Sequence, residues 1–252
     1  MKRILITNDD GVRSEGLEVL AASLEAFGEV TVVAPMTEAS AIGHALTLRR
    51  PLRLEQFGPR VFAVDGTPTD CVNVAVTTVL RSLPDLVVSG INKGWNIGDD
   101  VTYSGTVSGA LEAALLGVPG IAVSLKFTRG AYDFSHAARW AASIAEGVLR
   151  RGLPARTFLN VNVPRGRPKG IRVTVQGTRN HITSVAERVD PKGNAYYWIE
   201  EGESQWEPHD RSDYSAVRDG FVSLTPLQTD LTAHAALAEV EELTAAPEGE
   251  LR

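Results

Sequence analysis

Sulfur is scarce in this sequence, which carries one cysteine, Cys71, and two methionines in 252 residues. A single cysteine excludes a disulfide within the chain. No apolar run approaches the roughly 20 residues that are needed to cross a bilayer. The apolar run near the N-terminus is short and is soon interrupted by Asp9, so we expect no secretory signal peptide. These absences predict a cytoplasmic protein without a membrane partner.

An excess of positive charge is missing as well. The chain has 25 Lys and Arg residues against 31 Asp and Glu residues, which gives a net charge of −6. Surfaces that bind nucleic-acid polymers are strongly basic, so this balance argues against such a partner. The contents of hydrophobic residues (43%) and charged residues (22%) are those of an ordinary globular protein. The length suits one large domain or one domain with an extension, and small molecules are the expected substrates.

The sequence is organised around residues 4–11, Ile-Leu-Ile-Thr-Asn-Asp-Asp-Gly. The apolar, β-branched run predicts a buried strand of a parallel sheet. Asp9 and Asp10 then lie at its carboxyl end, where open α/β sheets bind ligands. Two carboxylates 4 Å apart repel by about 4 kcal/mol at an effective dielectric constant of 20, and a divalent cation between them removes the repulsion. In the alternative, one Asp caps the next helix and the other is solvated.

Strands and helices alternate over the first two thirds of the chain. We expect strands at residues 4–6, 30–34, 86–90, 121–125 and 157–163, helices at residues 14–27, 70–80, 107–116 and 135–152, and a hairpin or two short strands within residues 47–64. This order predicts a doubly wound, Rossmann-like α/β fold with a mostly parallel sheet. The Gly-x-Gly-x-x-Gly turn of dinucleotide-binding folds is missing after the first strand, which argues against NAD binding.

A connector rich in Pro, Gly and basic residues, at residues 164–170, predicts the end of this core. We expect a catalytic core at residues 1–163 and an extension at residues 164–252. Within the extension we expect strands at residues 171–175, 185–189, 195–199 and 221–226, a helix at residues 232–244 and a frayed tail at residues 245–252. The hairpin and the helix suit contacts between subunits better than catalysis.

Two further strand ends carry polar residues that could join the aspartates. Ser40 and His44 follow the second strand, and Asn92 follows the strand at residues 86–90. Carboxylate, hydroxyl and amide oxygens without cysteine describe a site for a hard cation, Mg²⁺ or Mn²⁺ rather than structural Zn²⁺. In the alternative, Ser40 is an ordinary loop hydroxyl, and His44 lies at the surface or lines the substrate site without binding metal.

Ser104, Gly105 and Thr106 open the helix at residues 107–116. Small residues at a helix start expose backbone N–H groups, and the helix dipole there favours an anion, so this segment predicts a phosphate cradle. Ser and Thr are also common helix N-caps, which is the structural alternative. A hard cation beside an anion cradle indicates phosphate-ester chemistry.

The sequence resembles the SurE survival proteins, a family of metal-dependent 5'-nucleotidases. The matching segments are residues 4–11 (ILITNDDG), 33–35 (VAP), 66–71 (GTPTDC), 88–92 (VSGIN), 96–100 (NIGDD), 103–106 (YSGT), 193–194 (GN) with 197–198 (YW), and 224–226 (LTP) with 230–232 (DLT). The resemblance implies a Rossmann-like fold and one divalent metal ion per subunit, held by Asp9, Asp10, Ser40 and Asn92. It also implies homodimers or homotetramers built through the C-terminal extension. Family members commonly have Arg and Gly around the ligand serine, where this chain has Ala39 and Ala41.

The activity implied is hydrolysis of nucleoside 5'-monophosphates, with some 3'-nucleotides and short polyphosphate. We expect Asp9 and Asp10 to be catalytic and the phosphate to be bound by Asn96, Ser104, Gly105 and Thr106. The nucleophile is a water activated by the metal or by an aspartate, or an aspartate itself. The alternatives are a phosphatase of broad specificity, an exopolyphosphatase and a nucleotide sensor without catalysis.

Overall fold

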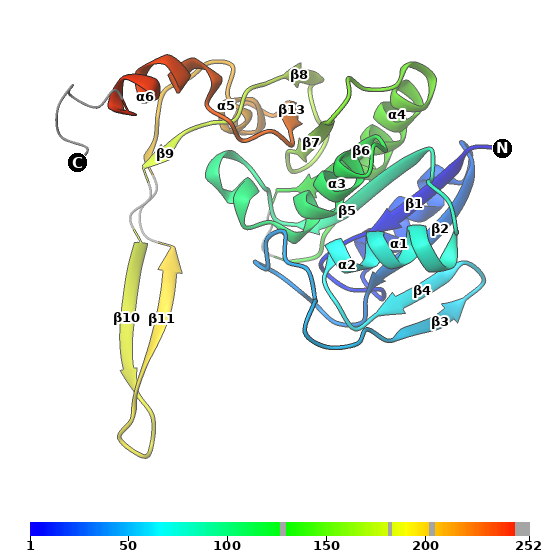
Figure 1. The fold of residues 1–252 in the computed structure, drawn as a ribbon, viewed down its shortest axis with the longest axis horizontal. Coiled ribbons are helices and arrows are strands. Elements are labelled where there is room, and N and C mark those ends of the chain that lie inside the picture. Colours follow the sequence, from blue (N-terminus) through cyan, green and yellow to red (C-terminus); the bar gives the residue numbers. More distant parts are fainter. Residues whose placement is uncertain (127–129, 181–182, 202–204, 245–252) are drawn as a thin grey trace, which may run out of the picture.

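The structure is a computed structural model of the chain, and it describes residues 1–126, 130–180, 183–201 and 205–244. Its centre is a nine-stranded sheet in the order β3-β4-β2-β1-β5-β6-β7-β13-β8 (Figure 1). The strands are β1 (Arg3–Thr7), β2 (Glu29–Pro35), β3 (Leu54–Gly58), β4 (Val61–Val64), β5 (Leu86–Lys93), β6 (Gly120–Leu125), β7 (Thr157–Val163), β8 (Ile171–Val173) and β13 (Val222–Gln228). The strands from β4 to β7 are parallel, whereas β3 and β13 are antiparallel to β4 and β7. The predicted mostly parallel α/β fold is confirmed.

Helices cover both faces of the sheet. They are α1 (Glu15–Leu24), α2 (Pro68–Val74) with a π-helical continuation (Ala75–Val79), α3 (Gly105–Leu115) and α4 (Ser135–Arg151), and a 3₁₀ turn (Gly98–Thr102) precedes α3. Helices α1 and α4 pack together, as do α2 and α3. The chain leaves β1 toward β2 on one side and returns to β5 on the other. The carboxyl ends of β1 and β5 therefore form the switch point of the sheet, where such folds bind ligands.

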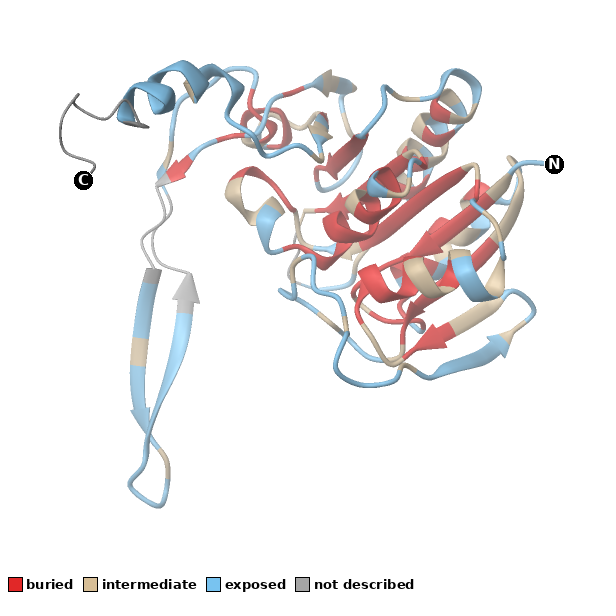
Figure 2. Cartoon of the chain, in the orientation of Figure 1, coloured by how far each residue is buried: buried red, intermediate tan, exposed pale blue. Residues whose placement is uncertain are grey.

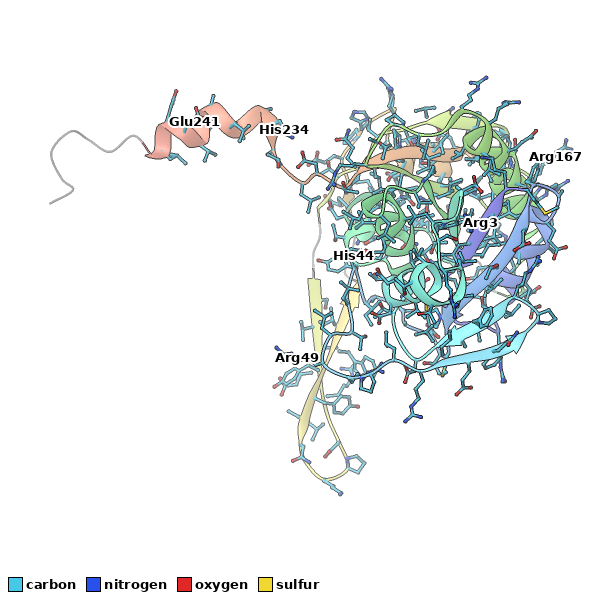
Figure 3. All side chains as sticks on the ribbon, turned by 45° about the vertical axis from the view of Figure 1, so that its right-hand side comes forward. Arg3, His44, Arg49, Arg167, His234 and Glu241 are labelled. Atoms are coloured by element: carbon cyan, nitrogen blue, oxygen red, sulfur yellow. The ribbon has the colours of Figure 1, made fainter. Side chains whose placement is uncertain are left out.

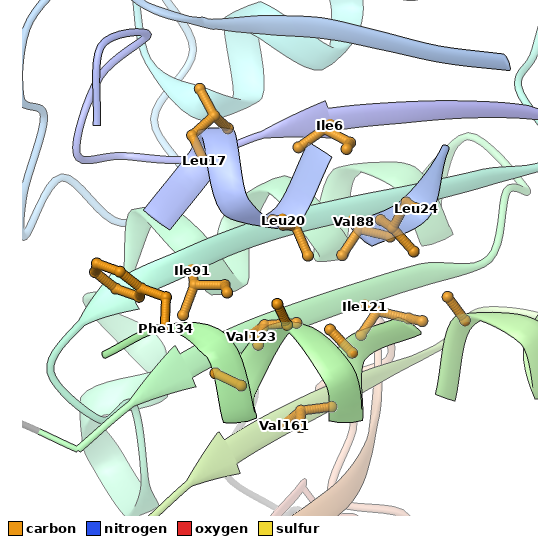
Figure 4. Close-up of a cluster of buried hydrophobic side chains, with 14 of the residues drawn as sticks. Ile6, Leu17, Leu20, Leu24, Val88, Ile91, Ile121, Val123, Phe134 and Val161 are labelled. Atoms are coloured by element: carbon orange, nitrogen blue, oxygen red, sulfur yellow. The ribbon is translucent and has the colours of Figure 1, made fainter. Parts of the chain in front are cut away.

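The core divides into two layers on either side of the central strands. Ile4 and Ile6 of β1 pack with Leu17 and Leu20 of α1 in the larger cluster, part of which is drawn in Figure 4. Leu5 points to the opposite face and belongs to the cluster that contains Cys71 and Ala113. Alternate residues of a strand point to opposite faces, so burial of three consecutive residues identifies β1 as a central strand. Figure 2 shows the central strands as largely buried.

Three predicted boundaries shift in the structure. Helix α1 ends at Leu24, before the predicted stop at Gly28, and a Cβ atom at Gly28 would lie 2.4 Å from the carbonyl oxygen of Lys2. The glycine there permits a close approach of two backbone segments. Helix α2 begins at Pro68 and has Thr67 as its N-cap, with a reciprocal hydrogen bond from the Thr67 N–H to Asp70. Helix α3 begins at Gly105, so residues 105 and 106 belong to the helix itself.

The C-terminal region adds to the main sheet and also extends away from it. It contains β9 (Arg179–Asn180), β10 (Thr183–Val189), β11 (Ala195–Glu201), β12 (Gln205–Trp206), α5 (Asp213–Arg218), a 3₁₀ turn (His234–Ala236) and α6 (Leu237–Thr244). The antiparallel β10–β11 hairpin, predicted from the sequence, projects from the sheet (Figure 1). The division into 1–163 and 164–252 stays a prediction, and the expected tail at 245–252 lies outside the described residues. In the described part of the chain, no helix has the length and apolar character of a membrane span, and the cytoplasmic location stays a prediction.

Candidate metal and phosphate site

The backbone segments that carry the predicted ligands approach one another at the switch point. Asp9 and Asp10 follow β1, and Asn92 lies near the end of β5, which pairs with β1 in parallel through Thr7 and Ser89. The loop after β2 reaches the same edge, because the Ala39 N–H donates to the Asp9 carbonyl oxygen at 2.8 Å. Three strand ends therefore meet where the sequence predicted.

Asp9 is buried against the first turn of α3, with 4% of its surface exposed. The Thr106 hydroxyl donates a hydrogen bond to Oδ1 of Asp9. A Cβ atom at Gly105 would lie 2.8 Å from the Asp9 Cβ and 2.9 Å from its Oδ2, so glycine is needed at this contact. Burial raises the pKa of Asp9 to about 6, with a further rise from the charge of Asp10, although the bond from Thr106 opposes it.

Asp10 has a carboxylate oxygen that suits a cation. Its Oδ2 atom is buried and has no hydrogen-bond partner among the described residues. Burial raises the pKa of Asp10, the nearby charge and backbone of Lys93 lower it, and Glu38 raises it. A buried carboxylate oxygen without a partner is unfavourable by about 1–3 kcal/mol or more. A divalent cation at this edge would satisfy that oxygen, so the residues fit the metal that the sequence implies.

Ser40 lies on an exposed part of the loop, and its hydroxyl donates to Oε1 of Glu38 at 2.7 Å. Ser40 donates its hydroxyl proton in this bond, so the lone pairs of its oxygen remain available to a cation. Ala41 adopts a φ of 54°, in the left-handed region that favours glycine. An alanine in this region is held there at a cost in backbone strain.

The amide of Asn92 is oriented by its own loop. Its Nδ2 donates to the Gly94 carbonyl oxygen at 3.0 Å. This bond uses the nitrogen, so the carboxamide oxygen is available as a hard ligand. The role of Asn92 as a metal ligand stays a prediction.

The predicted phosphate-binding residues also have structural roles. Ser104 is the N-cap of α3, and its hydroxyl oxygen accepts from the Val107 N–H at 3.1 Å. The Thr106 hydroxyl points at Asp9, while Nδ2 of Asn96 donates to the Ser124 hydroxyl at 2.8 Å. The start of α3 nevertheless lies against Asp9 through Gly105, which places its N-terminal dipole beside the carboxylates. Phosphate binding by these four residues stays a prediction.

Several residues that hold the loop before α3 were not identified from the sequence. Asn160 and Asn162 of β7 both donate to the carbonyl oxygen of Asn96, and Asn162 also accepts from the Asn96 N–H. Asp213 of α5 accepts from the Gly98 N–H at 2.9 Å, so the C-terminal region holds the same loop. The asparagines could have been found, because polar residues at alternate positions of an otherwise apolar strand require buried partners.

Two clefts of the described structure are lined by residues other than the predicted metal ligands. The first, of about 570 Å³, is lined by His136, Arg139, Trp140, Ser143, Arg167 and Pro168. A second cleft, of about 520 Å³, is lined by residues 46–50, which follow the loop that carries Ser40. The described residues contain no cluster of three or more His, Cys, Asp and Glu side chains suited to a metal. The candidate ligand set differs from such a cluster, because only Asp9 and Asp10 are acidic. Its other two ligands are the neutral side-chain oxygens of Ser40 and Asn92.

Comparison with known proteins gives consistent matches over most of the chain. A family model described as survival protein SurE matches residues 4–183. The 5'-nucleotidase SurE of Syntrophotalea carbinolica is 54% identical over 230 residues, which cover 91% of this chain and 92% of that protein. The 5'-nucleotidase SurE of Geotalea daltonii is 51% identical over 243 residues, covering 95% and 98%. The crystal structure of the SurE protein from Aquifex aeolicus matches with a TM-score of 0.86 and 43% identity, and covers 96% and 99% of the two chains.

Proposed function

The chain belongs to the survival protein SurE family, and from this premise we propose that it is a metal-dependent 5'-nucleotidase, which hydrolyses nucleoside 5'-monophosphates to nucleoside and phosphate. The observation that carries the proposal is the pair of adjacent carboxylates, Asp9 and Asp10, at the switch point and against the first turn of α3. A phosphate monoester is an anion, and it can lie beside two carboxylates when a cation compensates their charge.

We propose that Asp9, Asp10, Ser40 and Asn92 hold one divalent ion, Mg²⁺ or Mn²⁺. The proposal is supported by the unpaired Oδ2 of Asp10, by the raised pKa values of both aspartates and by the hard oxygen donors of Ser40 and Asn92. Such an ion supplies charge neutralisation at the phosphoryl group and lowers the pKa of water.

The chain's own groups then bind and orient the phosphoryl group. The N–H groups of Gly105 and Thr106 lie at the start of α3 beside Asp9 and can donate to phosphoryl oxygens, and Ser104 is the N-cap before them. We propose that Asn96 adds a further contact to the phosphoryl group. In the route that we favour, a water oxygen attacks phosphorus and an aspartate accepts the water proton. The aspartate then gives this proton to the ribose oxygen as the bond between phosphorus and that oxygen breaks. Attack by the aspartate itself would produce an acyl phosphate.

The function is tested by measuring phosphate release from AMP by the full-length protein with Mn²⁺, with Mg²⁺ and after treatment with EDTA. We expect release with the metals and none after EDTA. Binding of AMP without release would identify a sensor instead. Parallel assays with 3'-AMP and short polyphosphate rank the other substrates that we propose. Acid quench with ³²P-labelled AMP separates the two routes, because a labelled chain would exclude direct attack by water.

We also propose that the protein assembles as a homodimer or homotetramer through its C-terminal region. The proposal is supported by apolar side chains that are exposed on the hairpin: Val185 (56%), Val189 (63%), Tyr197 (62%), Trp198 (61%) and Ile199 (80%). Leu237, Val240 and Leu243 of α6 are exposed as well. Apolar patches of this kind mark interaction sites in soluble proteins.

A further inference from the structure

Glu112, in the middle of α3, is a buried carboxylate with 7% of its surface exposed. Its Oε2 atom lies 2.7 Å from Nε2 of His44, and its Oε1 atom accepts from Nδ2 of Asn73 at 2.7 Å. Burial raises the pKa of Glu112, but the hydrogen bonds of His44 and Asn73 outweigh it and leave the pKa below its ordinary value. Glu112 is therefore ionised at neutral pH, and its bond to His44 is charge-assisted.

His44 belongs to the loop that carries Ser40 (His44 is labelled in Figure 3). The Ser40 hydroxyl bonds to Glu38 of the same loop, so this bond does not tie Ser40 to the rest of the protein. The position of Ser40 depends on the contacts that flank it. On one side Ala39 bonds to Asp9, and on the other the Gly43 N–H donates to the Tyr103 carbonyl oxygen at 2.9 Å. The bond between His44 and Glu112 adds a charged side-chain anchor on this second side.

Helix α3 connects this anchor with the aspartate site. Thr106 in its first turn holds Asp9, and Glu112 follows Thr106 by six positions, roughly 9 Å along the axis at 1.5 Å per residue. Nine residues of α3 are buried: Gly105, Thr106, Val107, Ser108, Gly109, Ala110, Glu112, Ala113 and Ala114. A helix packed in this way is rigid, so it fixes the His44 anchor relative to Asp9.

We propose that His44 is a positioning residue, which with Glu112 and Asn73 forms a clamp that holds Ser40 at the metal-binding edge. The inference rests on the proposed function, because it takes Ser40 as a metal ligand. Without the clamp, the loop samples positions in which Ser40 cannot reach the cation that Asp9 and Asp10 bind. The clamp therefore contributes to metal affinity without touching the metal. Groups that orient metal ligands in this way typically account for 10–100-fold in affinity.

The test measures Mn²⁺ binding to the full-length, metal-free protein by the electron paramagnetic resonance signal of free Mn²⁺. For His44→Ala we expect affinity to fall about tenfold, as for removal of an outer partner of a metal ligand. His44→Gln keeps a donor that can reach Glu112, and we expect it to restore most of the affinity. His136→Ala is the matched control, because His136 also bonds to a side chain, that of Arg139 on α4, away from the loop. The control should bind Mn²⁺ like the wild type.

A double-mutant cycle distinguishes the clamp from a general loss of stability. Ser40→Ala removes the ligand, so a further His44→Ala substitution should change Mn²⁺ affinity by less than about twofold if His44 acts through Ser40. Equal losses from His44→Ala in both backgrounds would overturn the proposal, as would full affinity in the single variant. If His44→Ala does not fold, Glu112→Gln takes its place in the cycle. A wild-type protein that binds no Mn²⁺ would contradict the proposed metal site itself, whereas wild-type binding with no effect of His44 would contradict the clamp alone.

Discussion

Burial gives the carboxyl group of Asp9 a pKa of about 6, well above its ordinary value of 3.8. The folded, metal-free chain therefore holds the Asp9 proton more tightly than the unfolded chain does. By linkage, the contribution of Asp9 to stability is largest below about pH 4 and is lost as the pH rises toward 6. A bound cation reverses this trend, because it favours the ionised carboxylate. The proposed metal ligand Asp9 thus destabilises the metal-free protein at neutral pH.

Asp9→Asn should abolish metal-dependent phosphate release and stabilise the metal-free protein. The free energy of unfolding should match that of the wild type near pH 4 and exceed it by up to about 3 kcal/mol at pH 7, at 1.4 kcal/mol per pKa unit. Urea unfolding at several pH values with EDTA measures the difference. Asp133→Asn is a control for which we expect a change in stability in the opposite direction. Hydrogen bonds from Ser135 lower the pKa of that exposed carboxyl, so its ionised form stabilises the folded chain at neutral pH. If the Asp9→Asn variant is less stable than the wild type at pH 7, other groups of the chain must stabilise the ionised carboxylate of Asp9, and the prediction is wrong.

Gly105→Ala should disturb the site while leaving the fold intact. The new Cβ would lie 2.8–2.9 Å from atoms of Asp9, so the carboxylate must move away from its bond with Thr106. We expect phosphate release to fall about 100-fold, since a displacement of about 1 Å at a reacting group has effects of this size. Gly147→Ala on α4 is the matched control, because a Cβ there meets no atom within 4 Å. It should keep full activity and gain about 1 kcal/mol of stability from helix propensity.

For single residues, the sequence predicted which side chains lie at the sheet edge better than it predicted the partners to which they bond. Asp9, Asp10 and Asn92 could be placed from the ends of apolar strands, because parallel strands end at one edge. The bond from Thr106 to Asp9 and the pairing of His44 with Glu112 could not be predicted. Both depend on which side of α3 faces β1 and the loop, and this follows from packing rather than from local pattern.

The loop after β2 contains a residue in an unfavourable backbone conformation. Ala41 has a φ of 54°, which costs an L-residue about 1–2 kcal/mol. Ala41→Gly should therefore stabilise the protein by about 1 kcal/mol, despite the greater freedom of glycine in the unfolded chain. Differential scanning calorimetry of the metal-free protein measures this effect. Ala39→Gly, outside the left-handed region, should be neutral or destabilising, and an equal gain in both variants would contradict the strain at Ala41.

The hairpin is the element that the proposed assembly depends on. Tyr197 and Trp198 of β11 are 62% and 61% exposed, more than large aromatic residues usually are. Replacing both with Ser should convert a dimer or tetramer to a smaller species in light scattering coupled to size exclusion. Leu83→Ser, at another exposed apolar residue, should leave the mass unchanged. A wild-type protein that is already monomeric would contradict the proposed assembly without affecting the metal site.

The elements of the first 163 residues could be predicted because apolar runs and helical spacing are clear there. The C-terminal region was harder. The strand at residues 221–226 was expected, but its pairing with β7, in which Leu224 lies opposite Val161, is a contact between distant segments. Helix α5 was missed because residues 213–218 are too few to show a period. Its place depends on Asp213, which accepts hydrogen bonds from the N–H groups of Gly98 and Gly177.

For the whole molecule, one sheet carries both the site and the parts that support it. The switch point brings Asp9, Asp10 and Asn92 together, α3 holds Asp9 from one face, and the C-terminal region holds the loop before α3 through Asp213. With a net charge of −6, the protein gives no general attraction to anions. A phosphate ester must therefore be attracted locally, by a cation at the carboxylates and by the start of α3.

Diffraction from a crystal soaked with Mn²⁺ and AMP, with the anomalous signal of manganese, tests this arrangement most directly. We predict one manganese peak at the switch point, roughly 2.0–2.3 Å from oxygens of Asp9 and Asp10 as is usual for hard cations, with the phosphate between it and the start of α3. A manganese ion bound elsewhere in an active crystal, with both carboxylates free of metal, would contradict the account.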